Sequence, residues 1–192
     1  MKHAVYFEFE EAGQENLAHV SKILAGVPGG VYQAVGSTIK RAAQRGLTTG
    51  MKIVAEEYAI GQNELKKQTK NRNTIVRDSG GSYEIEFGYT GYLIPLMKFD
   101  TKVSADGRVY SRVKRSSART LLDNAFQAKM GSHTGIYERL GASRFPVEEL
   151  FGPASVQAFY ANEDTTDKMD AVLQSTFNSR IDHEITRVLN GW

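Results

Sequence analysis

The chain has 192 residues, of which 41% are hydrophobic and 24% charged, a composition typical of a folded globular protein rather than a disordered one. It contains no cysteine, which excludes disulfides, thiolate nucleophiles and cysteine-ligated zinc or iron–sulfur sites. No apolar run approaches the roughly 18 to 20 residues that cross a bilayer, and acidic residues stand where a signal peptide is apolar. We therefore expect neither a membrane span nor a secretory leader.

The formal net charge is only +2, but the charge is unevenly distributed along the chain. Residues 1–119 contain 18 basic and 12 acidic side chains, whereas residues 120–192 contain 6 basic and 10 acidic ones. Opposite charges in the two portions favour their attraction, either within one molecule or between neighbouring copies. This asymmetry points weakly to self-association.

The first third of the chain has the periodicity of amphipathic helices after one short strand. Residues 4–9 are rich in aromatic side chains and partly alternate with polar ones, which predicts a strand. A helix follows and ends at Gly26. The clearest periodic signal lies in residues 31–60, which predict one helix of about eight turns. Residues 63–69 predict a short third helix with Asn63 as its N-cap.

Three glycines, Gly36, Gly46 and Gly50, fall inside the predicted long helix. Each lowers helix stability by up to about 1 kcal/mol relative to alanine. We expect either a bend at these positions or a neighbouring helix that packs closely against the small residues.

In the middle of the chain the period changes to two, which predicts three antiparallel hairpins. Ser79-Gly80-Gly81 and Asp106-Gly107 supply the turns of the first two, since glycine readily adopts the positive φ that tight turns need. Pro95 has no N–H to donate and is expected at a strand edge or start. The strands are expected at residues 74–77 and 82–89, at 93–104 and 108–114, and at 124–130 and 135–140.

Helical periodicity returns after Pro146, briefly at residues 147–150 and 156–160 and then in a long final helix. Asp164, Thr165 or Thr166 is expected to cap that helix, and Gly191 to end it. The order of helices, antiparallel strands and helices predicts an α+β fold. We expect one domain, residues 1–192, mainly helical at 1–70, mainly β at 73–140 and mainly helical at 146–192.

Residues that could carry catalysis are sparse. The sequence has no phosphate-binding loop, nucleophile elbow or dinucleotide-binding glycine motif. Asp164, Asp167 and Asp170 could hold a cation, but acids at the start of a helix are better explained by its dipole. A hydrolase that uses His133 with Glu138 or Glu149 would lack a positioned nucleophile. We expect no enzymatic activity, no catalytic residue, no cofactor and no metal.

Ten basic residues gather in two segments that contain no acid. The first segment has Lys66, Lys67, Lys70, Arg72 and Arg77, and the second has Arg108, Arg112, Lys114, Arg115 and Arg119. Strand parity places Arg108, Arg112 and Lys114 on one face together with Tyr110. Because no DNA-reading motif accompanies them, a solvated sheet face is favoured over sequence-specific binding, while non-specific contact with DNA stays open.

The stretch from Met130 to Ser155 resembles a known family. It reads Met130-Gly-Ser-His133-Thr-Gly135-Ile136-Tyr137-Glu-Arg139, followed by Arg144-Phe-Pro146-Val-Glu-Glu-Leu150-Phe-Gly152-Pro153-Ala-Ser155. This is similar to phage minor tail protein Z and related tail-completion proteins, in which a Gly-His-x-Gly turn leads into an aromatic strand and then Arg-x-Pro-Ile-x-Glu-Leu-x-Gly-Pro-Ser. The family's turn usually reads Ser-Gly-His where this chain has Gly131-Ser132-His133, and Ala154 is an additional residue.

The resemblance implies a structural virion protein that completes the head-proximal end of a phage tail, or of a tail-like particle, and helps join it to the neck. Such proteins act as rings around the DNA channel. The implied partners are other copies of the chain, with a hexamer as one option, tail-tube or tail-terminal proteins, neck or head-completion proteins and, transiently, DNA. The implied location is the virion, after assembly in the host cytoplasm, without membrane contact.

Two sets of candidate functional residues follow, together with an alternative function. The assembly candidates are Met130, His133, Gly135, Ile136, Tyr137, Arg139, Arg144, Pro146 and Leu150. The candidates for contact with DNA or a partner are Lys66, Lys67, Lys70, Arg72, Arg108, Arg112, Lys114 and Arg115. The alternative is a nucleic-acid-binding accessory protein without sequence specificity.

Overall fold

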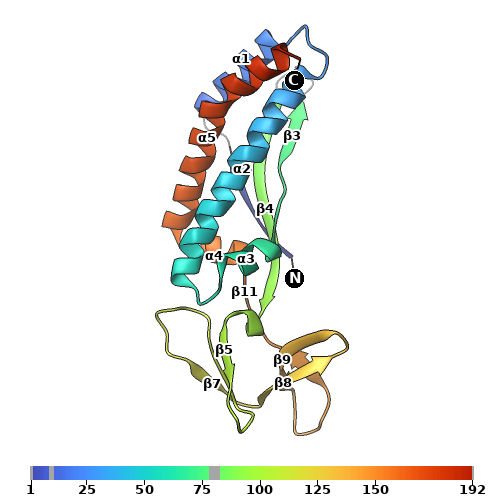
Figure 1. Cartoon of the computed structure of the whole chain (residues 1–192), viewed down its shortest axis with the longest axis vertical. Helices are drawn as coiled ribbons and strands as arrows, with labels where there is room; N and C mark the ends of the chain where they lie inside the picture. Colours follow the sequence, from blue (N-terminus) through green and yellow to red (C-terminus); the bar gives the residue numbers. More distant parts are fainter. Residues whose placement is uncertain (1, 9–10, 78–82, 192) are drawn as a thin grey trace. The chain divides into compact units, whose positions relative to one another are not determined.

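The computed structural model describes residues 2–8, 11–77 and 83–191, and the chain divides into two compact units. The helical unit consists of Ala4–Gly50, Lys70–Thr90 and Phe159–Trp192. The strand unit consists of Met1–His3, Met51–Thr69 and Gly91–Ala158. Each unit contains residues from all three sections predicted from the sequence, the mainly helical 1–70, the mainly β 73–140 and the mainly helical 146–192. The fold is α+β, as predicted (Figure 1).

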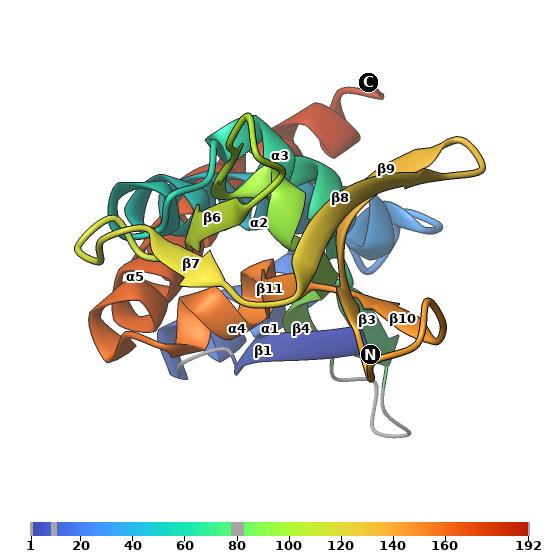
Figure 2. The same cartoon turned by 90° about the horizontal axis from the view of Figure 1, so that it is seen from below.

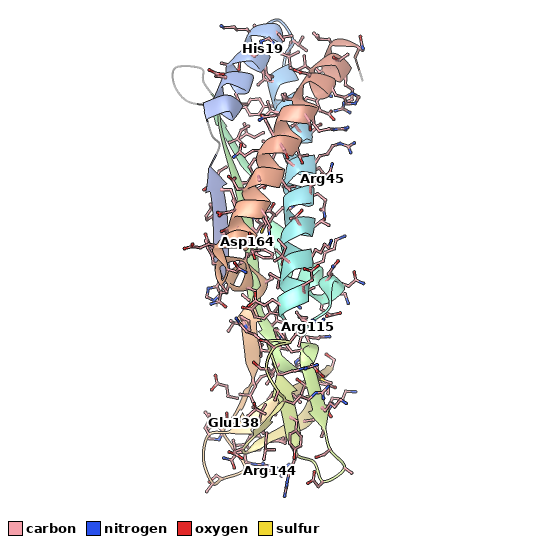
Figure 3. All side chains as sticks on the ribbon, turned by 90° about the vertical axis from the view of Figure 1, so that its left-hand side faces the viewer. His19, Arg45, Arg115, Glu138, Arg144 and Asp164 are labelled. Atoms are coloured by element: carbon pink, nitrogen blue, oxygen red, sulfur yellow. The ribbon has the colours of Figure 1, made fainter. Side chains whose placement is uncertain are left out.

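In the helical unit, residues 30–50 of the long helix α2 (Gly30–Glu57) lie beside helix α5 (Glu163–Leu189), and α2 continues into the strand unit from Met51 (Figures 1 and 3). Helix α1 (Glu11–Ile23) contacts α5. Most of the apolar residues that define the period of α2 and α5 are buried, among them Val35, Ala42, Leu173 and Phe177. The helices therefore form because each buries one apolar face against the other elements.

Two of the three glycines in α2 explain how closely α5 approaches. A Cβ on Gly46 would lie 2.8 Å from Leu173 Cγ, and a Cβ on Gly50 would collide with Met169. A Cβ on Gly36 would meet only Ile75 Cδ1, at 3.9 Å. Close helix packing, one of the two outcomes expected from the sequence, is therefore found at Gly46 and Gly50, but not at Gly36.

Strand β4 (Tyr83–Pro95) is the centre of the largest sheet and continues from the helical unit into the strand unit. In the helical unit, β1 (Lys2–Glu8) and β3 (Thr74–Arg77) pair with it. The β3 pairing is antiparallel, as the hairpin pattern predicts, while the predicted turn residues 79–81 lie outside the described residues. In the strand unit, β11 (Phe151–Ala154) pairs antiparallel with the end of β4. Strand β2 (Thr69–Asn71) also pairs with β4.

Tyr89 on β4 ties this sheet to the helices. Its side chain is fully buried, and its hydroxyl donates a 2.8 Å hydrogen bond to the carbonyl of Ala43 on α2. The rings of Phe7 and Phe159 meet it edge-on, with centroids 6.0 and 6.3 Å away. Burial raises the pKa of the Tyr89 hydroxyl far above its ordinary value, so it stays a neutral donor.

The strand unit contains two further three-stranded sheets, made of short hairpins. One comprises β5 (Asp100–Val103), β6 (Val109–Arg112) and β7 (Thr120–Leu122). The other comprises β8 (Ala125–Met130), β9 (His133–Arg139) and β10 (Val147–Glu149). Val109, Ala125 and Ile136 form a buried cluster, against which Leu122 and Leu150 pack. Gly107 has φ +84° and Gly131 φ +62°, which explains glycine in the two tight turns.

Three short helical elements lie in the strand unit or, for α4, across its boundary with the helical unit. Helix α3 (Gln62–Gln68) precedes β2, and the 3₁₀ turn η1 (Leu96–Lys98) follows β4. Helix α4 (Ser155–Tyr160) follows β11 directly. Inside the unit, the hydroxyls of Thr69 and Ser155 lie 2.5 Å apart, and Thr69 also donates to the carbonyl of Leu65.

Four local predictions are wrong. Residues 147–149 form strand β10 rather than a helix, because Glu148 and Glu149 pair with Glu138 and Tyr137 of β9, and Leu150 lies between β10 and β11. Residues 93–104 are not one strand, since η1 interrupts them. The N-cap of α3 is Gly61 rather than Asn63. The N-cap of α5 is Asn162, whose Oδ1 accepts from the N–H of Asp164 at 3.0 Å.

Candidate functional site

The segment that carries the family resemblance begins with a hairpin that extends beyond its neighbouring strand. β8 and β9 pair from Ala125–Glu138 to Met130–His133, whereas β10 pairs only with residues 137–139 (Figure 2). Met130 is exposed at the end of this hairpin. His133 Nε2 lies 2.6 Å from Glu149 Oε1, and a Cβ on Gly135 would collide with Glu149 Oε1 at 2.6 Å and crowd His133 Nε2 at 3.2 Å. Glycine at position 135 therefore leaves room for the contact between His133 and Glu149.

Three of the candidate assembly residues serve the interior of the strand unit. Ile136 is 1% exposed and Tyr137 6% exposed. Leu150 packs on the buried cluster, and its N–H donates to the Ile136 carbonyl at 2.8 Å. In the sequence, Ile136 and Tyr137 suggest an apolar anchor for a partner. In the structure, both side chains belong to a buried strand. Direct contact with a partner through these two side chains would require the sheet to open.

The loop between β9 and β10 is different, because it carries apolar side chains outward. Leu140 is 61% exposed and Phe145 63% exposed. Arg139 lies over the ring of Phe126 at 4.4 Å, and Arg144 lies over the ring of Phe145 at 5.7 Å. The N–H of Leu140 donates to the carbonyl of Pro146, and this hydrogen bond closes the loop. The peptide bond between Phe145 and Pro146 is cis. We call residues 139–146 the apolar loop; Glu138 and Arg144 are labelled in Figure 3.

Most cations of the second basic segment already have a carboxylate or carbonyl partner. Arg112 Nε donates to Asp100 Oδ2 at 2.6 Å, and Arg119 donates to Oδ1 of the same residue at 2.8 Å. The hydrogen bond from Arg119 and then that from Arg112 hold the pKa of Asp100 below its ordinary value. Lys114 and Arg108 are also paired, with Glu57 at 2.7 Å and Asp106 at 3.2 Å.

The remaining cations of the two segments have mixed environments. Arg115 donates to the carbonyl of Ala55 at 2.9 Å. Lys67 pairs with Glu64 at 2.7 Å, and this hydrogen bond lowers the pKa of Glu64. Lys66, Lys70 and Arg72 are exposed, and the side chain of Arg77 lies outside the described residues. Among the described side chains of the two segments, Lys67, Arg108, Arg112, Lys114 and Arg119 are thus paired with a carboxylate, which partly neutralises their charge.

A cationic group that the sequence analysis missed lies in the helical unit, between α2 and α5. It borders a cleft of about 660 Å³ and consists of Lys40, Arg41 and Arg45 from α2 and Arg180 and Arg187 from α5. Glu184, 2% exposed, lies among them. We call this the α2–α5 cleft. In the sequence, Arg41 and Arg45 are four positions apart, and Glu184 lies four positions after Arg180 and three before Arg187. These spacings place the side chains on one face of each helix, but only the fold brings α2 and α5 together.

Within the described part of the chain, no group of three or more His, Asp or Glu side chains is placed to hold a metal ion. None of the described helices combines the length and apolar character that crossing a membrane requires. The described surface offers contacts through the apolar loop and through cations. His133 is paired with Glu149 rather than with a hydroxyl nucleophile.

In comparisons with known proteins, no family model, curated protein or solved structure matches this chain.

Proposed function

We propose that this chain is a structural assembly protein that completes the head-proximal end of a phage tail, or of a tail-like particle, and helps join it to the neck. It would act as a ring of copies. The resemblance of residues 130–155 to tail-completion proteins gives the biological context. The observation that carries an assembly role is the apolar loop, with Leu140 and Phe145 more than half exposed.

The chemistry of the apolar loop is that of a protein-binding surface. Energetic hot spots of protein interfaces are enriched in aromatic side chains and arginine, and truncation of one costs about 2 kcal/mol or more. Leu140 and Phe145 supply the apolar area, while Arg139 and Arg144 flank them in sequence and stack on aromatic rings. The hydrogen bond between Leu140 and Pro146 fixes the ends of the loop, which lowers the entropy lost on binding.

The alternative of a nucleic-acid-binding accessory protein draws little support from the two basic segments. Arg108, Arg112, Lys114 and Arg119 each pair with a carboxylate, so their charges are partly neutralised inside the molecule. Binding to phosphate through these residues would have to compete with the existing ion pairs.

The test is end-binding to tail tubes by the double variant Leu140→Ser, Phe145→Ser. Tubes from the particle that the chain belongs to are mixed with purified protein, and occupied ends are counted by electron microscopy. The wild type should bind at one end, and the double variant should bind at least tenfold more weakly. A matched control is Tyr160→Ser, Leu189→Ser, which removes two apolar side chains of 55% and 54% exposure from outside the loop.

Binding along the whole tube, or equal loss in both double variants, would contradict the proposal. Aspartate at Ile136 or Tyr137 is not a useful test, because both side chains are buried and the change would unfold the small sheet.

A further inference from the structure

We propose that the α2–α5 cleft binds the phosphodiester backbone of a nucleic-acid duplex without reading its bases. This inference goes beyond the assembly role and does not depend on it. The helical unit brings together like charges from α2 and α5, which are far apart in the sequence. Arg187 Nη2, for example, donates to Ser37 Oγ across 150 positions of sequence, at 3.0 Å.

The cleft carries an excess of positive charge. Among the described residues, five cationic side chains and the carboxylate of Glu184 border it, which leaves a formal excess of four positive charges with His183 counted as neutral. Arg187 Nε lies 2.9 Å from Glu184 Oε2, while Arg180 and Arg41 lie 3.7 and 3.8 Å from Oε1. One buried carboxylate thus partly neutralises three guanidinium groups, and Lys40 and Arg45 have no ion pair within the described residues.

The arginines also keep hydrogen-bond donors for a ligand. A guanidinium has five N–H donors and binds phosphate oxygens in a bidentate manner. Arg187 uses one donor on Ser37, and its contact with Glu184 lacks the alignment of a hydrogen bond. The Nε of Arg180 is buried, so a ligand would be reached by the terminal nitrogens of this guanidinium, whose Nη2 lies 3.7 Å from Glu184 Oε1, beyond hydrogen-bond distance. Ser37 and Thr176 line the same cleft and add neutral hydroxyls.

The composition of the cleft favours a nucleic-acid backbone over an acidic protein segment. Every described residue that lines it is polar or charged. Protein partners are held chiefly by buried aromatic anchors and arginine, and no aliphatic or large aromatic residue lines this cleft among the described residues. Contacts to phosphate need only cations and hydrogen-bond donors, and interfaces with nucleic acid are correspondingly polar and positive.

The same composition distinguishes a duplex from single strands. Proteins that bind single strands without sequence preference stack the bases on aromatic side chains. No aromatic ring other than that of His183 lines the α2–α5 cleft among the described residues. We therefore expect binding that is independent of sequence and weaker for single strands than for duplexes.

The experiment measures the anisotropy of a labelled duplex of about 20 base pairs against the full chain, over a series of salt concentrations. The key variant is Lys40→Ala, Arg45→Ala, which removes two cations and leaves the ion pairs of Glu184 intact. Each neutralised phosphate contributes about 0.9 to the slope of log K against log salt, so the slope should fall by about 1.8. Affinity at low salt should fall at least tenfold.

The matched control is Lys52→Ala, Lys102→Ala, which makes the same charge change at two exposed lysines outside the cleft. It should retain the wild-type slope. Circular dichroism and urea unfolding should be unchanged in both double variants, because neither removes an ion pair found among the described residues. Equal losses in the two variants would overturn the assignment to the cleft.

Four further arms identify the ligand. Two duplexes of unrelated sequence should bind alike, and a tenfold difference between them would overturn backbone-only recognition. A single strand that binds as tightly as the duplex would overturn the duplex assignment. Polyglutamate that binds as tightly as the duplex would replace nucleic acid with an acidic protein partner. Binding of inorganic pyrophosphate without binding of duplex would show a site for small phosphates instead.

Discussion

Replacement of Gly46 and of Gly36 by alanine should change stability in opposite directions, although both residues lie inside the same helix. In each case alanine gains up to about 1 kcal/mol in helix propensity. At position 36 the new Cβ would be 3.9 Å from Ile75 Cδ1, an ordinary van der Waals contact. Gly36→Ala should therefore stabilise the protein by about 0.5–1 kcal/mol.

At position 46 the new Cβ would lie 2.8 Å from Leu173 Cγ and 2.9 Å from the Tyr89 hydroxyl oxygen. Leu173 and Tyr89 are both fully buried, so neither has space to move aside. Overpacking of this kind costs about 1–3 kcal/mol, and loss of the hydrogen bond from Tyr89 to Ala43 adds about 1 kcal/mol. After the gain in propensity is subtracted, Gly46→Ala should destabilise the protein by about 1–3 kcal/mol.

The assay is urea unfolding followed by circular dichroism at neutral pH, with both variants and the wild type at one protein concentration. The two variants should differ by about 1.5–4 kcal/mol in unfolding free energy, with unchanged dependence on urea. In a thermal scan each kcal/mol should shift the midpoint by about 2–4 °C. A Gly46→Ala protein as stable as Gly36→Ala would refute the close packing of α5 on α2.

Three other predictions concern single side chains. Asn162→Ala removes the N-cap of α5 and should lower the unfolding free energy in urea by about 1 kcal/mol, whereas Asn162→Gly should lower it by only a few tenths. Because the folded-state pKa of Asp100 is depressed, its ion pairs stabilise the protein above about pH 4 and lose this effect as pH falls through that pKa. Asp100→Asn should thus be less stable than wild type at pH 7, and urea titrations should show the difference shrinking toward pH 3. Glu184→Gln removes the negative charge shared by three arginines; unfolding free energy should drop by about 1–2 kcal/mol while duplex affinity rises. An unchanged or lower affinity would show that Glu184 does not oppose anion binding.

Much of the fold could be predicted because its elements bury one face and therefore have a clear period. The long helices and the three hairpins follow from apolar spacing and from glycine-containing turns such as Asp106-Gly107. The strands at residues 147–154 could not be predicted in this way. Val147 and Leu150 are three positions apart, as on a helix face, but pairing with β9 and β4 decides their structure. Local spacing does not contain this information.

The candidate site shows a second limit of sequence reasoning. Apolar residues in a motif can face the core or the solvent, and Ile136 does the first while Phe145 does the second. The basic residues behave similarly, since runs such as 108–119 look unpaired in sequence. Their carboxylate partners include Asp100 and Glu57, which lie outside the run. Only the three-dimensional arrangement shows which charges remain available to a ligand.

Charges at the two ends of α5 are explained by the helix dipole, whereas the cations that border the α2–α5 cleft are not. Glu163 and Asp164 stand at its start and Arg187 in its last turn, and both placements favour the helix dipole without any function. The dipole gives no such reason for Lys40, Arg41 and Arg45, which lie midway along α2 and beside Arg180 and Arg187. Like charges gathered in this way repel one another and lower stability, and among the described residues that line the cleft Glu184 alone carries a carboxylate. An anionic ligand would relieve that repulsion, which is why the α2–α5 cleft, rather than the more numerous cations of the strand unit, is the place to look for bound nucleic acid.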